Sequence, residues 1–269
     1  IASTGIFNSQ IDVIGTSAHG ADVTDVSTNN TDVDQGGAVS ANDGDSDPNN
    51  TDSPTPVSFP RIEIKKELGS VTNNGDATYD VTFNVSVHNS SIQNLSSVSV
   101  NDVLSGAHPS FGTYTPTGSL AAGQYKIVTA PSITGSGALS LTSGFTGESA
   151  HKELASGNLA SDATNVISFT IKVYPSSTSL TGYLNSASAV GTGEGSLTTS
   201  DTSNDGSSYQ DGAGDFNPNE TDDNTPTQVD FTESGALGAT KQVMGVTNNN
   251  DGSFNIKYKI KAKNFGDVV

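Results

Sequence analysis

The chain has 269 residues, which fits one or two domains, and a formal net charge of −18. Ser, Thr and Asn together number 93, whereas apolar residues make up only 32% of the chain and Cys is absent. The low apolar content argues against a helical bundle, and the lack of Cys excludes disulfides, zinc–thiolate sites and cysteine nucleophiles. The negative charge disfavours binding to phosphate backbones, so we expect no nucleic acid as a partner. No apolar run reaches the roughly 18 residues of a membrane-spanning helix, so we expect no membrane insertion.

The first 59 residues contain an acidic segment that recurs later in the chain. Residues 44–52 (GDSDPNNTD) match residues 214–222 (GDFNPNETD), and Thr-Pro follows each segment after a short gap. Residues 25–27 (DVS) match residues 201–203 (DTS) in the same order. Collinear matches of this kind are typical of tandem repeats.

Strand-like alternation of apolar and polar residues dominates the middle of the chain. It is clearest over residues 79–87, 167–173 and 254–260, where every second residue is apolar, as in a strand with one face in a core. Weaker candidates follow the same pattern over 61–68, 95–104, 124–130, 137–142, 180–190 and 226–232. This many short strands in about 170 residues predict an all-β fold, an antiparallel β-sandwich.

A third match defines the repeat. Residues 71–79 (VTNNGDATY) recur as 246–254 (VTNNNDGSF). We therefore expect residues 1–59 to be the C-terminal part of one repeat, 60–231 a complete sandwich repeat, and 232–269 the N-terminal strands of the next. With no initiator Met and no secretory signal at its start, the chain is interpreted as a piece of a longer array.

The acidic segments predict calcium binding. Residues 22–52 hold eight Asp and residues 201–223 hold six Asp and one Glu, with no Lys or Arg in either. Such crowding costs Coulomb energy, which a divalent cation would offset, and Ca²⁺ takes carboxylate and amide oxygens as ligands. The candidate ligands are Asp25, Asp32, Asp34, Asp45, Asp47, Asp52, Asp201, Asp205, Asp211, Asp215, Asn217 and Asp222. The alternative is a solvated acidic linker.

The segment from Asp25 to Pro56 resembles the acidic D-x-S…D-P-N…T-P-V segments in the repeat arrays of giant bacterial surface adhesins. The sequence IEIKK at 62–66, followed by NNGD at 73–76 and Tyr79, is similar to the first strands of their modules. The resemblance implies tandem Ig-like modules stiffened by Ca²⁺ in a secreted protein of marine or gliding bacteria. It also implies an extracellular location on the bacterial cell surface, neighbouring repeats as partners, and no catalytic residue.

Two other function classes remain open at this stage. The chain can be a subunit of an extracellular filament joined by strand exchange, or a module that binds a surface glycan or a host or substratum ligand. An enzyme is not expected, because the four His residues stand outside any zinc-protease motif and no nucleophile elbow, P-loop or dinucleotide fingerprint occurs.

Overall fold

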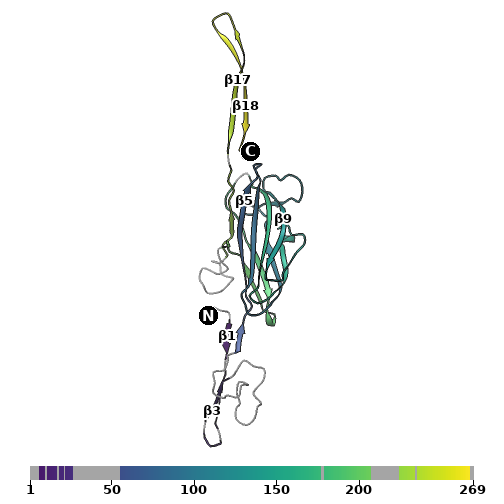
Figure 1. Cartoon of the computed structure of the whole chain (residues 1–269), viewed down its shortest axis with the longest axis vertical. Coiled ribbons are helices and arrows are strands. Elements are labelled where there is room, and N and C mark those ends of the chain that lie inside the picture. The colour runs from purple at the N-terminus through teal and green to yellow at the C-terminus, as the bar shows by residue number, and fades with distance from the viewer. Residues whose placement is uncertain are drawn as a thin grey trace.

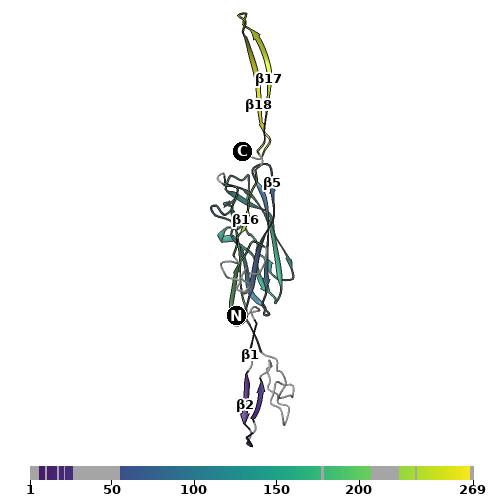
Figure 2. The ribbon, with the colours of Figure 1, turned by 90° about the vertical axis from the view of Figure 1, so that its left-hand side faces the viewer.

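The computed structural model describes residues 6–9, 11–16, 18–20, 22–26, 55–176, 179–206, 224–233 and 235–266. The described part is elongated, with a β-sandwich in the middle and β-hairpins projecting from both ends (Figures 1 and 2). The strands of the sandwich are β5 (Ile62–Asn73), β6 (Tyr79–Asn89), β7 (Leu95–Asp102), β8 (Thr113–Tyr114), β9 (Gln124–Gly135), β10 (Ser140–Leu141), β11 (Glu153–Leu159), β12 (Thr164–Tyr174), β13 (Tyr183–Asn185), β14 (Ala187–Thr192), β15 (Thr198–Thr202) and β16 (Thr227–Val229).

Two five-stranded sheets form the sandwich. One has the order β10-β11-β7-β14-β15 and the other β5-β6-β12-β9-β8, while β13 and β16 form a separate two-stranded sheet. Within the described strands every ladder is antiparallel except β8–β9. The predicted antiparallel β-sandwich is therefore confirmed. The described helices are two 3-10 turns of three residues each, so no helix in this part of the chain has the length needed to cross a membrane.

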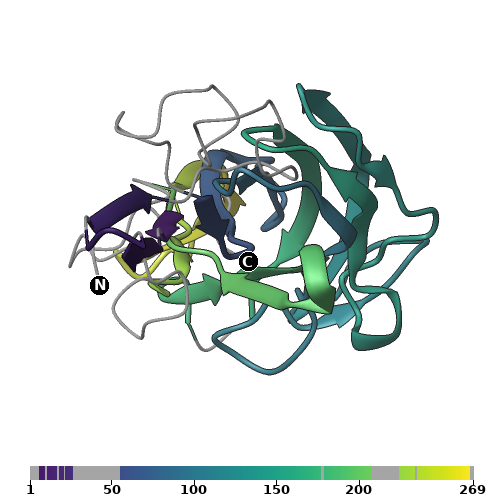
Figure 3. The same cartoon turned by 90° about the horizontal axis from the view of Figure 1, so that it is seen from below.

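The core follows directly from the alternation in the sequence. In β12 every second residue is buried, and β6 shows the same alternation over its first half. Phe83 of β6 and Phe169 of β12 face the core, with their ring centroids 5.7 Å apart. Viewed along the long axis, the strands surround this core (Figure 3). The period-2 signal therefore located both the strands and their buried faces.

One predicted strand divides into two. The apolar run over 180–190 becomes β13, which pairs with β16, and β14, which pairs with β7 and β15. Both strands bury alternate residues, so periodicity alone gave no sign that the chain changes partners near Ser186.

Strand β15 closes the free edge of β5. The N–H of Ile64 donates to Oδ2 of Asp201 at 2.6 Å, and the N–H of Lys66 donates to the carbonyl of Asn204 at 3.0 Å. Because buried N–H groups need acceptors, these bonds complete the edge of one sheet with groups from the other.

The C-terminal hairpin reproduces the first hairpin of the sandwich. It consists of β17 (Leu237–Asn248) and β18 (Phe254–Asn264). Each residue pair in its ladder has a counterpart 175 residues earlier in the β5–β6 ladder. The first such pair is Leu237↔Asn264, which corresponds to Ile62↔Asn89. The register shift also falls at the equivalent place in both ladders.

The turns of the two hairpins share their hydrogen bonds. The N–H of Asn74 donates to the carbonyl of Thr78, and the N–H of Asn249 donates to the carbonyl of Ser253, both at 3.0 Å. The side-chain amides of the same two Asn residues reach the hydroxyls of Thr78 and Ser253, at 3.1 and 3.0 Å. The repeated sequence thus gives the same turn twice.

The N-terminal strands reproduce the last strands of the sandwich. They are β1 (Ile6–Ser9), β2 (Asp12–Thr16), β3 (Asp22–Val26) and β4 (Thr55–Ser58). The β2–β3 ladder has the register of β14–β15, and β1 pairs with β4 as β13 pairs with β16. Asp25 thereby occupies the ladder position of Asp201.

Side chains of the sandwich hold both connections to the neighbouring strands. At one end, Nε2 of Gln93 donates to the carbonyl of Ser58 at 3.0 Å. At the other end, the hydroxyl of Tyr79 and Nδ2 of Asn73 donate to the carbonyl of Thr232, at 3.0 and 3.1 Å. The chain therefore enters and leaves the sandwich at opposite ends, and its backbone is anchored at each (Figure 1).

Replacing Tyr79 with Phe removes only the hydroxyl at this connection and keeps the ring contact with Phe231, whose centroid lies 4.7 Å away. We expect Tyr79→Phe to lower the free energy of unfolding by about 0.5–1.5 kcal/mol, the net worth of one hydrogen bond. Tyr258→Phe is the control, because Tyr258 is 44% exposed and its substitution should stay within about 0.5 kcal/mol. Denaturant titration of both variants tests this, and equal stabilities would contradict it.

Candidate functional site

Three polar residues lie inside the sandwich core. Lys66 continues the inward face of Ile62 and Ile64 on β5, and Asp102 ends the inward face of β7. Asn185 occupies the inward face of β13. All three are buried, and the side chains of Lys66 and Asp102 are fully excluded from solvent. Strand alternation therefore aims three polar groups at one another from three strands.

The three side chains meet at the lysine amine. Nζ of Lys66 is in direct contact with Oδ2 of Asp102 and with Oδ1 of Asn185. Nδ2 of Asn185 donates to the carbonyl of Val103 at 2.9 Å, which fixes the carboxamide with its oxygen toward the lysine. Oδ1 of Asp102 is buried and has no hydrogen-bond partner among the described residues.

Aromatic rings enclose the cluster. Nζ of Lys66 lies 4.1 Å from the ring centroid of Phe83 and 5.6 Å from that of Phe169. Burial lowers the pKa of the Lys66 amine, and the neighbouring Asp102 carboxylate only partly opposes this shift. The neutral amine is thereby favoured relative to a lysine in water.

Stability alone does not explain such a cluster. Removing an ion pair from water costs several kcal/mol per ion, and apolar residues of similar volume are often as stable or more so. An amine in contact with a carboxyl group and with a carboxamide instead brings together the components of an acyl transfer, which needs a nucleophile, a proton carrier and an electrophile.

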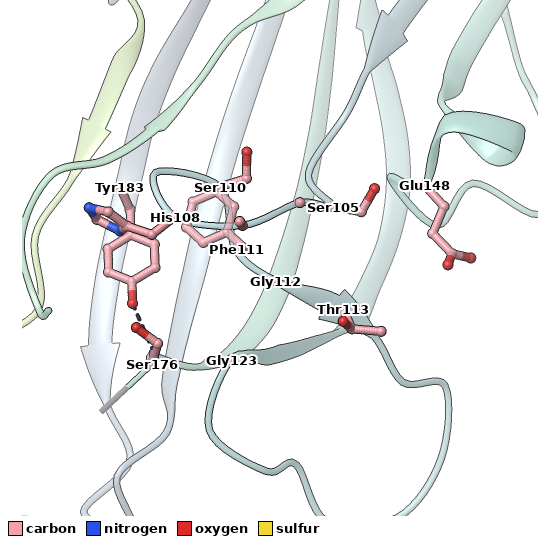
Figure 4. Close-up of a pocket in the computed structure, with 12 residues that line it drawn as sticks. Ser105, His108, Ser110, Phe111, Gly112, Thr113, Gly123, Glu148, Ser176 and Tyr183 are labelled. Carbon is pink, nitrogen blue, oxygen red and sulfur yellow. Dashed lines mark hydrogen bonds between the residues drawn. The ribbon is translucent and has the colours of Figure 1, made fainter. Parts of the chain in front are cut away.

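A separate surface cavity of about 640 Å³ lies beside the loop after β7, with His108 and Tyr183 at one side and Glu148 at the other (Figure 4). The Tyr183 hydroxyl accepts the N–H of Ser176 at 2.9 Å and donates to the carbonyl of Ser179 at 3.0 Å. His108 stands edge-on against the Tyr183 ring, with centroids 4.9 Å apart. Because Tyr183 is 2% exposed, it forms no aromatic platform for a glycan.

The structure places three of the predicted calcium ligands. The carboxylate of Asp201 accepts the N–H of Ile64, Asp205 is exposed in a bend after β15, and the backbone of Asp25 in β3 pairs with that of Val13 in β2. No group of three or more acidic or His residues that could hold a metal occurs among the described residues. The other candidates lie outside the described residues: Asp32, Asp34, Asp45, Asp47, Asp52, Asp211, Asp215, Asn217 and Asp222. Calcium binding stays a prediction.

The sequence contains one signal for the buried cluster, which is separate from the acidic segments. A lysine at the inward phase of a strand, two residues after Ile64, is unusual because Lys is almost never fully buried without a partner. The same phase places Asp102 after Val100 and Asn185 after Tyr183. The alternation does not predict which of these inward-facing polar groups contact one another.

Comparisons with known proteins add little. No family model and no curated protein matches the chain. Among solved structures, the major pilin subunit BcpA of Bacillus cereus is similar with a TM-score of 0.39 and 11% identity, and a variant of that subunit with 0.39 and 10%. Each alignment covers 94% of this chain and 63% of the pilin chain. The likeness is too low to carry a function, so the proposals below rest on the chain's own residues.

The contact of Asp201 gives a test that separates a structural role from metal binding. Asp201→Ala leaves the buried N–H of Ile64 without its acceptor and should cost about 1–3 kcal/mol of unfolding free energy. Asp201→Asn keeps an acceptor oxygen and should cost less. Denaturant titrations in calcium and in chelator should give the same loss. A loss of stability seen only in calcium would mean that Asp201 acts mainly as a metal ligand.

Proposed function

We propose that the chain is part of the stalk of a large secreted bacterial surface adhesin, built from tandem β-sandwich modules. Residues 60–231 form one complete module, residues 1–59 the end of the module before it, and residues 232–269 the start of the next. The observation that carries this proposal is the identity of ladder register between the terminal hairpins and the matching strands of the sandwich.

The positions of the two connections support a linear array. A chain that enters at one end of each module and leaves at the other places successive modules in a row. The hydrogen bonds from Gln93, Asn73 and Tyr79 to the connecting backbone resist bending at each joint. A stalk needs both properties, because it has to hold a distant binding region away from the cell.

The exposed face of the C-terminal hairpin supports the same proposal. Ile256 is 48% exposed and Ile260 is 69% exposed, whereas their counterparts Val81 and Val85 are fully buried. In a complete module this apolar face would pack against the opposite sheet, as that of β5–β6 does.

The filament alternative is less well supported. In strand exchange, the N-terminal strands of one copy would have to complete the C-terminal hairpin of another. These two parts together correspond only to β5–β6 and β13–β16, so they lack counterparts of β7 to β12, including β12, the neighbour of β6 in its sheet. Such a joint would leave much of the core empty.

Small-angle scattering over a range of protein concentrations separates these alternatives. A stalk segment should give one elongated particle whose maximum dimension does not change with concentration. Strand exchange should give growth of the particle with concentration. Surface location is tested on intact cells of the source organism, where external protease should remove the protein.

Calcium would stiffen the stalk through its acidic segments. A cation held by Asp45, Asp47 and Asp52 in one segment, and by Asp215 and Asp222 in the other, would offset their mutual repulsion. Extracellular calcium sites commonly have Kd values of about 10⁻⁴–10⁻³ M, so millimolar calcium outside a cell would fill them. The adhesive ligand, whether a glycan or another host or substratum group, would bind elsewhere in the full-length protein.

Thermal melts in calcium and in chelator test this. Calcium at a hundred times Kd should stabilise the wild-type protein by about 2.7 kcal/mol for one site, because the ion binds only the folded state. Asp215→Ala should lose most of that increment, whereas Asp162→Ala, at a position outside both acidic segments, should keep it. A wild-type melting temperature that is the same in calcium and chelator would rule out calcium stiffening.

A further inference from the structure

The contacts of the buried lysine point to a covalent modification. Nζ of Lys66 is in contact both with the carboxamide oxygen of Asn185 and with the carboxylate of Asp102. We propose that Lys66 and Asn185 become joined by an intramolecular isopeptide bond, which forms inside the folded sandwich with Asp102 as the proton carrier. The inference does not depend on the stalk proposal, since it concerns chemistry within a single module.

The reaction balances without any added reagent. Asp102 takes one proton from the Lys66 ammonium, which leaves a neutral amine and a neutral carboxylic acid. Nζ attacks Cγ of Asn185, while the Asp102 acid protonates the carboxamide oxygen as charge develops there. Asp102 then transfers a proton from the attacking nitrogen to Nδ2. As the Cγ–Nδ2 bond breaks and ammonia leaves, Asp102 takes back the proton from the oxygen, which becomes the carbonyl of the new amide. The product is a secondary amide beside a protonated Asp102, and nothing is oxidised or reduced.

The surroundings favour each reactant form. Burial lowers the pKa of the Lys66 amine, so less free energy is needed to reach the nucleophilic neutral form. The rings of Phe83 and Phe169 exclude water from the nitrogen, and water would otherwise compete as a nucleophile. Proton transfer also converts a buried ion pair into two neutral groups, which lowers its desolvation cost.

The fold supplies the orientation. Lys66, Asp102 and Asn185 come from β5, β7 and β13, which lie in three different sheets, so they meet only once the sandwich has formed. The bond from Nδ2 of Asn185 to the carbonyl of Val103 holds the carboxamide in place. Fixing reactants in contact replaces a bimolecular encounter, which accounts for a large part of the barrier in such reactions. The same peptide groups in an unfolded chain would not react.

The neighbouring partial modules repeat parts of the cluster. Lys241 stands one repeat after Lys66, and its Nζ lies 3.9 Å from the ring centroid of Tyr258, which is the counterpart of Phe83. In the N-terminal part, residues 5–9 (GIFNS) match residues 182–186 (GYLNS), and the Asn at 8 pairs with Pro56 of β4 where Asn185 pairs with Thr227 of β16. Lys241 is exposed in this chain, so it serves as an unreacted reference.

The mass of the intact wild-type chain is the first measurement. The cross-linked protein should be lighter than its sequence by one ammonia molecule. A tryptic digest should then contain a branched species that joins peptide 66–126 to peptide 173–241, uncleaved after Lys66 but cleaved after Lys241. Loss of ammonia confined to an unbranched peptide 67–126, which contains Asn74-Gly75, would be cyclisation of that Asn and would overturn the proposal. So would an unmodified mass.

Variants assign the roles. Asp102→Asn keeps the shape of the side chain but cannot accept a proton, so we expect the full sequence mass and no branched peptide. Asp80→Asn is the matched control, because Asp80 pairs with Lys172 at 2.8 Å on the surface and its loss should leave the branched peptide intact. A branched peptide in Asp102→Asn would exclude Asp102 as the proton carrier. The wild-type mass decides the bond itself, even if a variant fails to fold.

Discussion

The burial of a lysine amine in an apolar core is the constraint that the rest of this structure has to satisfy. Strand alternation places Lys66 on the same face as Ile62 and Ile64, and a side chain at that phase has no route to solvent. The sandwich therefore has to provide partners for the amine, and it does so from two other strands through Asp102 and Asn185. Because an apolar residue would pack there at lower cost, the cluster is better explained by what its groups do together than by the stability they add.

The place of the cluster matters if the chain is pulled at both ends, as the proposed stalk would be. Tension enters near residue 60 and reaches Lys66 within the first half of β5. Asn185 lies directly opposite Thr227 of β16 in the β13–β16 ladder, and the Thr227 hydroxyl donates to the carbonyl of Lys66 at 2.6 Å. From Thr227 the chain leaves the module within a few residues, at Thr232. A bond between Lys66 and Asn185 would thus carry force across the module by its shortest route. Strands β6 to β12 would not be stretched.

The strands and their inward faces could be read from the sequence, whereas the site could not. Alternation located β6, β12 and β18 closely, because apolar residues alternate with polar ones along each of them. In β6 and β12 the apolar face is buried, whereas in β18 it is exposed. Alternation gave no information on which strands are neighbours, so it missed the change of sheet between β13 and β14 and the meeting of Lys66 with Asp102. The acidic segments are visible in the sequence because their charges are adjacent. A cluster assembled from three distant strands shows in the sequence only as single polar residues at inward-facing positions of otherwise apolar strand faces.

Calcium and the amide would act on different parts of the proposed stalk and under different conditions. The acidic segments precede the connection at each end of the module, and a cation there would follow the calcium concentration outside the cell. An amide inside the sandwich would not respond to calcium, pH or chelator once formed. By the chain-entropy argument used for disulfides, closing a loop of about 100 residues removes roughly 4.7 kcal/mol of unfolded-state freedom at 25 °C. That is a large fraction of the 5–15 kcal/mol by which domains are usually stable. This module has a modest apolar content and no disulfide. Such a bond would therefore add resistance to unfolding beyond what its core composition provides.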